Sequence, residues 1–150
     1  MTMTDDAFIN RFEQGLVPAE SFHHTDHVYL AFAYLMKYPV LEALERFVNA
    51  LKRFAAAHAK ARLYHETITF ACFFLIREAI ARSGVNDWEQ FCIFHPELLL
   101  WKNSILTRYY NEATLKSDLA RKVFIFPEKI DVTAPEGVPF RLDKSLEASG

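Results

Sequence analysis

The chain has 150 residues, 51% of them hydrophobic and 15% aromatic, so it can bury one sizeable core but hardly two. Charged residues make up 24% and the formal net charge is -2, which leaves no basic stripe of the kind that binds nucleic acid or anionic lipid. The N-terminus is acidic and polar, and no apolar run reaches the roughly 18 residues of a membrane span. We therefore expect a cytoplasmic protein with no nucleic-acid partner and no membrane partner.

Cysteine and glycine usage narrow the class further. Cys72 and Cys92 lie far apart in apolar runs, which suits buried thiols in a reducing compartment better than a disulfide framework. Only four glycines occur in the chain, which leaves little turn chemistry for β-hairpins, and the apolar spacing is mostly helical. The predicted fold class is all-α: an up-down helical bundle with extra short helices and an extended C-terminal tail. Residues 1–126 are predicted to form the bundle domain.

The first two predicted helices are bounded by capping residues and prolines. Thr4 can cap a helix whose apolar face includes Phe8 and Phe12 and which ends at Gly15. Ser21 or Thr25 can cap a second helix that runs to residue 38, where a proline follows and breaks it. This second helix is almost wholly apolar after its first turn, which predicts that it is covered on several sides.

Three further helices follow in chain order. Residues 40–58 have apolar side chains at three- and four-residue spacing against charged ones, which is typical of an amphipathic helix. Residues 64–82 are apolar around nearly the whole circumference, so this fourth helix should be buried centrally or covered by a second copy of the chain. A fifth helix is predicted over residues 87–94, with shorter helical turns up to residue 126.

The tail, residues 127–150, contains three of the six prolines among alternating hydrophobic and charged residues. This pattern predicts an extended, non-helical segment. We expect it to dock either on the bundle or on a neighbouring chain, and the second possibility implies a homodimer.

Topology is predicted to gather the histidines at one end of the bundle. Short connections make the second, third and fourth helices antiparallel neighbours, so the starts of the second and fourth lie beside the end of the third. Five of the six histidines fall at these positions: His23, His24, His27, His58 and His65. His95 lies elsewhere, and we interpret it as a helix terminus.

The leading functional hypothesis is a metal centre. His24 and His27 stand three residues apart on one helical face, and His65 joins them from the fourth helix. Neutral imidazole and carboxylate ligands suit zinc or non-haem iron, so His24, His27 and His65 are the predicted metal ligands. Glu66 is the predicted catalytic residue, as a fourth ligand or as the base for a metal-bound water in a metal-dependent hydrolase. No nucleotide cofactor is expected.

Two alternatives remain open. Two adjacent helix N-termini favour an anion, so the same end could belong to a non-catalytic module that binds a small carboxylate or phosphate ligand. Arg62 and Tyr64 are the predicted ligand-binding residues, together with backbone amides and protonated histidine, and Lys60 is expected at the same end beside Arg62. In the other alternative, the cluster of histidines and Glu66 only caps the bundle of a dimeric structural protein.

Several motifs resemble those of an uncharacterised family of small bacterial all-helical proteins. The motifs are F-x-H-x-D-H-V at Phe22, His24, Asp26, His27 and Val28, Y-H-E-T-I-T at 64–69, R-Y-Y at 108–110 and L-A-R-K-V-F at 119–124. The resemblance covers most of the chain up to residue 126 and implies that His24, His27, His65 and Glu66 act as a unit, without implying a reaction. The architecture is also distantly similar to DinB-like metal-binding four-helix bundles, although their late H-x-x-x-H pair has no counterpart here.

Overall fold

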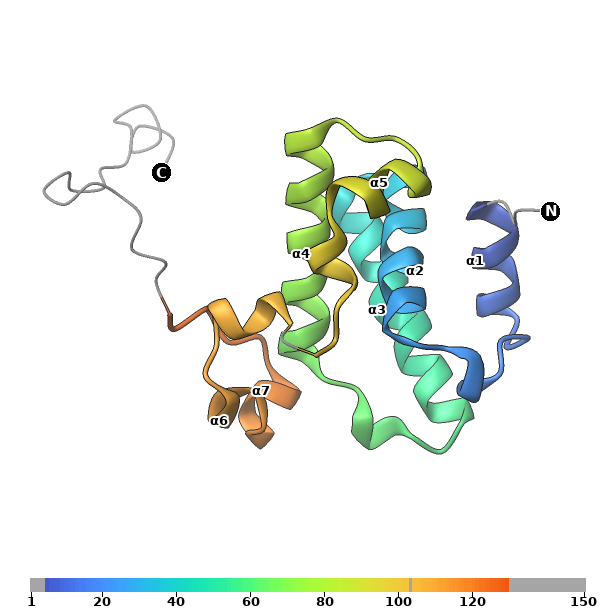
Figure 1. Cartoon of the computed structure of the whole chain (residues 1–150). Helices are drawn as coiled ribbons and strands as arrows, with labels where there is room; N and C mark the ends of the chain where they lie inside the picture. Colours follow the sequence, from blue (N-terminus) through green and yellow to red (C-terminus); the bar gives the residue numbers. More distant parts are fainter. Residues whose placement is uncertain (1–4, 103, 130–150) are drawn as a thin grey trace, which may run out of the picture.

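The computed structural model describes residues 5–102 and 104–129, which form an all-α bundle (Figure 1). The predicted fold class is therefore confirmed. The main helices are α1 (Asp5–Glu13), α2 (His24–Lys37), α3 (Val40–Ala57), α4 (Glu66–Ser83) and α5 (Trp88–Phe94). The short elements are η1 (Ala19–Ser21), η2 (Ala61–Leu63), η3 (Pro96–Leu99), η4 (Ile105–Arg108), α6 (Glu112–Leu115) and α7 (Asp118–Lys122). Tail residues 130–150, with their predicted docking, lie outside the described residues.

Helix α2 is the centre of the core. It packs against α1, α3, α4 and η3, and five consecutive residues, 30–34, are fully buried. Such a helix has no polar face because every side of it meets another element. Aromatic side chains from the neighbouring segments, including Phe12, Phe73 and Phe91, join this core.

Helix α4 is covered less completely than its sequence predicts. Phe73 and Ile76 are buried, but Phe74 on the same helix is 42% exposed. Besides α2 and α3, helix α4 contacts the short elements η3, η4 and α7, and these do not cover its whole surface.

The helix boundaries follow local signals with two corrections. Helix α2 begins after His23 as its N-cap residue instead of Ser21 or Thr25: the backbone N–H of His23 donates to the Asp26 carboxylate, and the backbone N–H of Asp26 donates to the carbonyl oxygen of His23. Helix α4 begins at Glu66 instead of residue 64, because the His65 side chain caps it. At the other end of α4, Gly84 adopts a left-handed conformation with φ of 71°, which ends the helix.

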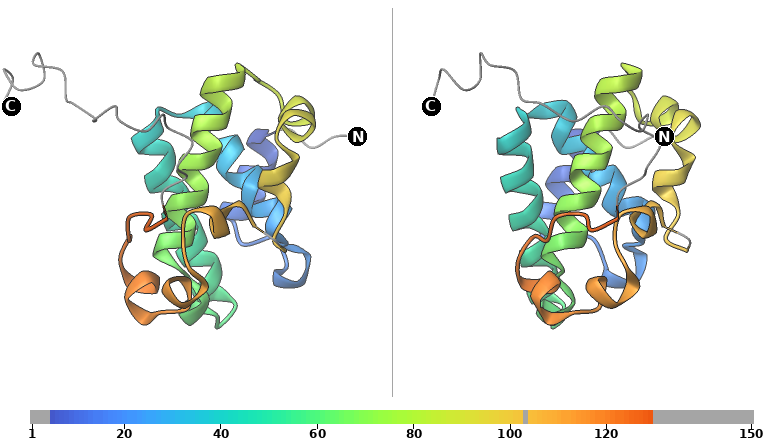
Figure 2. Two further views of the ribbon diagram at one scale, coloured as in Figure 1. Left: turned by 60° about the vertical axis from the view of Figure 1, so that its left-hand side comes forward. Right: turned by 90° about the vertical axis from the view of Figure 1, so that its left-hand side faces the viewer.

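The predicted chain directions are confirmed. Helices α2 and α4 both begin at the end of the bundle where α3 finishes, the lower end in Figure 1. The C-terminal elements α6 and α7 lie at this same end, beside the start of α4 (Figure 2). None of the described helices combines the length and apolar character needed to cross a membrane.

Candidate functional site

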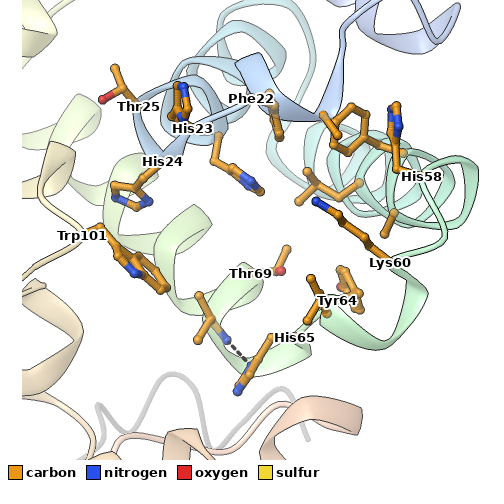
Figure 3. Close-up of a pocket in the computed structure, with 17 residues that line it drawn as sticks. Phe22, His23, His24, Thr25, His58, Lys60, Tyr64, His65, Thr69 and Trp101 are labelled. Carbon is orange, nitrogen blue, oxygen red and sulfur yellow. Dashed lines mark hydrogen bonds between the residues drawn. The ribbon is translucent and has the colours of Figure 1, made fainter.

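A pocket of about 630 Å³ opens at the end of the bundle where α2 and α4 begin (Figure 3). Five histidines line it: His23, His24, His27, His58 and His65. Its other walls are mainly apolar and aromatic, with Phe22, Leu51, Phe54, Leu63, Ile68 and Trp101 among them. The structure therefore brings the five histidines predicted at this end into one pocket. His95 lies outside the pocket, at the C-cap of α5.

His65 is held by hydrogen bonds at both ring nitrogens. The backbone N–H of Ile68 donates to Nδ1 over 3.1 Å, and Nε2 lies 2.6 Å from the carbonyl oxygen of Leu115. A carbonyl only accepts, so Nε2 carries the proton and donates it to Leu115. Burial lowers the pKa of His65, which keeps the ring neutral, as its role as an acceptor requires. In this arrangement His65 has no lone pair left for a metal ion.

His24 is held at one nitrogen only. Its Nε2 lies 3.1 Å from the carbonyl oxygen of Leu98 in η3, so this nitrogen donates and Nδ1 keeps its lone pair. The ring also packs against Trp101, with 5.4 Å between the ring centroids. Burial lowers the pKa of His24, so the imidazole is neutral at pH 7.

His27 lines the pocket with a ring that forms no hydrogen bond within the part of the chain that the structure describes. Its ring packs against Phe22, with 4.3 Å between centroids, and no hydrogen bond joins the ring to any described residue. Every fully buried side-chain nitrogen or oxygen in residues 5–102 and 104–129 has a partner, so the unpartnered His27 nitrogens must reach pocket space. Burial, with a smaller effect from His24, lowers the pKa of His27 to about 4. The pocket thus offers one imidazole donor and one imidazole acceptor from this ring.

Glu66 and Arg62 lie in a neighbouring groove, apart from the histidine pocket. Tyr64 lines both hollows. Its hydroxyl donates to Glu66 over 2.6 Å, and burial together with this bond raises the pKa of Tyr64. The structure therefore separates the predicted base, Glu66, from the predicted ligands His24 and His27.

The electrostatics of the pocket differ from those of two open helix N-termini. The His65 side chain accepts from the backbone amide of Ile68 at the start of α4, and the backbone amide of Asp26 at the start of α2 donates to the carbonyl oxygen of His23, so neither helix start leaves these amides open. Positive charge comes instead from Lys60, whose side chain reaches toward the middle of the pocket (Figure 3). Lys60 is the only lysine in the lining, which contains no arginine and no carboxylate among the described residues.

The metal prediction gains no support from this geometry. Within residues 5–102 and 104–129, no three His, Cys, Asp or Glu side chains are grouped so that they could hold a metal ion. His65 could not act as a ligand without losing one of its two hydrogen bonds, and Nε2 of His24 is bonded to the Leu98 carbonyl, which leaves only Nδ1 of that ring.

Sequence reasoning did not predict the place of every pocket residue. His58, predicted at this end of the bundle, is half-buried against Phe54, with 4.5 Å between ring centroids. Trp101 reaches the pocket from the loop after η3, and no local pattern in the sequence signals this. Lys60 was expected at this end beside Arg62, and the structure places Lys60 in the pocket lining but Arg62 in the neighbouring groove.

Comparisons with protein-family models, with curated proteins and with solved structures each found no match to this chain. The resemblances based on motifs therefore remain predictions.

Proposed function

We propose that the protein is a non-catalytic cytoplasmic module that binds a small organic acid in the histidine pocket. The observation that carries the proposal is a pocket of about 630 Å³ with largely apolar walls and an unbonded neutral imidazole, His27. Pockets of this size and lining suit small organic molecules, with a few polar groups that orient the ligand.

The lining suggests how such a ligand is held. Phe22, Phe54 and Trp101 offer aromatic surface to an apolar or aromatic body. A carboxylate directed at Lys60 would gain a charge-assisted hydrogen bond, and His27 would donate a further, neutral one. Because His24, His27 and His65 are neutral at pH 7, Lys60 supplies the charge recognition and His27 supplies direction.

The test is a thermal-shift screen of aromatic and aliphatic carboxylates, each paired with its alcohol analogue, in the presence of a chelator. We expect stabilisation by one or more acids and little by the alcohols; a ligand at 100 times its dissociation constant stabilises by about 2.7 kcal/mol. Lys60→Met should weaken binding by roughly tenfold, the effect of losing one charge-assisted contact.

Lys116→Met is the matched control, since Lys116 is an exposed lysine outside the pocket that pairs with Glu112. It should leave the affinity unchanged. Equal binding of acids and alcohols, or equal effects of the two lysine substitutions, would refute recognition of an acid.

A metal-dependent hydrolase requires His65 to give up one of its two hydrogen bonds. Metal analysis of protein purified without a nickel column tests this alternative. We expect less than about a tenth of an equivalent of zinc or iron, since ligands committed to other bonds bind metal weakly. Close to one equivalent, lost in His24→Ala, would favour the hydrolase over the binding module.

A further inference from the structure

A second hollow of about 680 Å³ lies beside the histidine pocket, and three separate parts of the chain form it. We call it the cationic groove. Its lining comprises Lys52 of α3, residues 61–64 of η2 and the following turn, Glu66 of α4, and Asp118, Arg121 and Lys122 of α7. Helix α7 contacts α4 in the fold, which brings residues 118–122 beside the segment around residue 62 (Figure 2).

The groove concentrates positive charge in a chain whose formal net charge is -2. Four cationic side chains line it, Lys52, Arg62, Arg121 and Lys122, against the two carboxylates Glu66 and Asp118. None of these four cations forms an ion pair with a described residue. Glu66, in turn, already accepts a hydrogen bond from the Tyr64 hydroxyl. The groove therefore holds an excess of uncompensated positive charge.

Two of the cations are already oriented by contacts that leave their charge available. Nη1 of Arg121 donates to the carbonyl oxygen of Arg62 over 2.8 Å, which fixes the guanidinium beside η2. The Nζ atom of Lys52 lies 5.1 Å from the centre of the Tyr64 ring, a cation–π contact. Side chains ordered before binding lose less conformational entropy when a ligand arrives.

We propose that the cationic groove binds the phosphate group of a small phosphorylated organic molecule. A guanidinium presents paired N–H donors in a plane, a geometry that matches two phosphate oxygens, and two arginines with two lysines can surround a dianion. The groove is larger than a phosphate group alone requires, and Leu63 with the Tyr64 ring supplies surface for the organic part. This site is separate from the histidine pocket and does not depend on the function proposed for it.

Isothermal titration calorimetry of the full chain with inorganic phosphate and with ribose 5-phosphate, at constant ionic strength, tests the proposal. We expect one binding site for either probe. Tighter binding of ribose 5-phosphate would identify a phosphorylated organic ligand, and equal binding would identify free phosphate; both outcomes support a phosphate site. Arg62→Gln and Lys52→Met should each weaken binding by about tenfold.

Arg77→Gln is the matched control, because Arg77 is exposed on α4, outside the groove, and its loss changes the net charge equally. Binding that falls as much in Arg77→Gln as in Arg62→Gln, or no binding of either probe at millimolar concentration, would overturn the proposal. Arg121→Gln also removes the contact with the Arg62 carbonyl, so its folding is checked by circular dichroism. His27→Leu should leave phosphate binding unchanged, which separates failure of this site from failure of the histidine pocket.

Discussion

Individual histidines in this pocket have different roles despite their proximity. His65 is a structural residue, since one nitrogen caps α4 and the other holds Leu115. His27 makes no such bond, and its ring is neutral because burial lowers its pKa to about 4. The same residue type thus closes the bundle at one position and remains available to a ligand at the other.

The pKa of His27 predicts a pH dependence of stability. The unfolded ring takes up a proton as the pH falls below 6.5, whereas the folded ring resists protonation until about pH 4. Above pH 6.5, His27 should therefore not affect the free energy of unfolding. As the pH is lowered from 6.5 to about 4, the free energy of unfolding should fall by up to about 3 kcal/mol.

Urea unfolding at a series of pH values between these limits measures the effect. His27→Leu should show a shallower dependence than the wild type, with a remaining slope because burial also lowers the pKa of His24. A variant as pH-sensitive as the wild type would show that His27 protonates freely in the folded protein.

His65 should stabilise the fold through two hydrogen bonds whose contributions can be measured separately by substitution. His65→Ala removes the cap of α4 and leaves the Leu115 carbonyl without its donor, so we expect a loss of about 2 to 4 kcal/mol. Asparagine is a good N-cap residue, so His65→Asn should retain the cap and lose roughly half as much. Chemical denaturation of the two variants measures the difference, and equal losses would mean that capping is not part of the role of His65.

At the scale of elements, the C-terminal segment is fastened to α4 through one buried threonine. The Thr67 hydroxyl donates to the carbonyl of Val123 over 2.8 Å and accepts from the backbone N–H of Ile125 over 3.1 Å. Tyr110 adds a third attachment, because its hydroxyl donates to the carbonyl of Ile125 over 2.7 Å. The two Thr67 bonds hold residues 123–125 along α4, and the Tyr110 bond ties the same segment to the chain after η4.

Replacing Thr67 with valine should loosen this segment while leaving the core of the bundle in place. Valine keeps the shape of threonine but removes both hydrogen bonds, which we expect to cost about 2 to 3 kcal/mol. Hydrogen exchange at the Ile125 amide should accelerate by at least about tenfold, whereas exchange in α2 should change little.

Thr107→Val is the control, since the exposed Thr107 hydroxyl bonds only within its own turn, to the carbonyl of Ser104. It should leave exchange at Ile125 unchanged. Unaltered exchange at Ile125 in Thr67→Val would show that other contacts hold the segment.

On the scale of the whole molecule, one hydrophobic core joins α1 through α5. Trp88 packs against Tyr29 and Phe32 of α2, with centroid separations of 4.9 and 5.5 Å. Phe91 completes this contact between α5 and the central helix. A shared core favours cooperative unfolding, because no helix of the group can unfold without exposing the apolar side chains of its neighbours.

Unfolding should therefore be cooperative when followed by different probes. Tryptophan fluorescence reports Trp88 at the core and Trp101 at the pocket, and circular dichroism reports all the helices. We expect the two urea-unfolding curves to superimpose, as in single domains of under about 150 residues. Separate midpoints would show that the pocket end unfolds independently of the core.

Much of the fold was predictable because its signals are local. Helical periodicity, prolines and short connections come from residues close in sequence, and they sufficed to predict the helices and the meeting of α2 with α4. The capping residues were predicted less well. A histidine is an uncommon N-cap, so His23 and His65 gave no signal as caps.

The sequence by itself determined an all-α bundle with its histidines at one end, because chain direction follows from helix lengths and short turns. Tertiary structure alone decided what each ring does. The partners of His24 and His65 are carbonyls 74 and 50 residues away, and Arg121 joins the cationic groove from a helix near the end of the described chain. These contacts form only when distant segments pack together, and they fix the direction in which each side chain points at the pocket. A pattern of neighbouring residues in the sequence does not predict them.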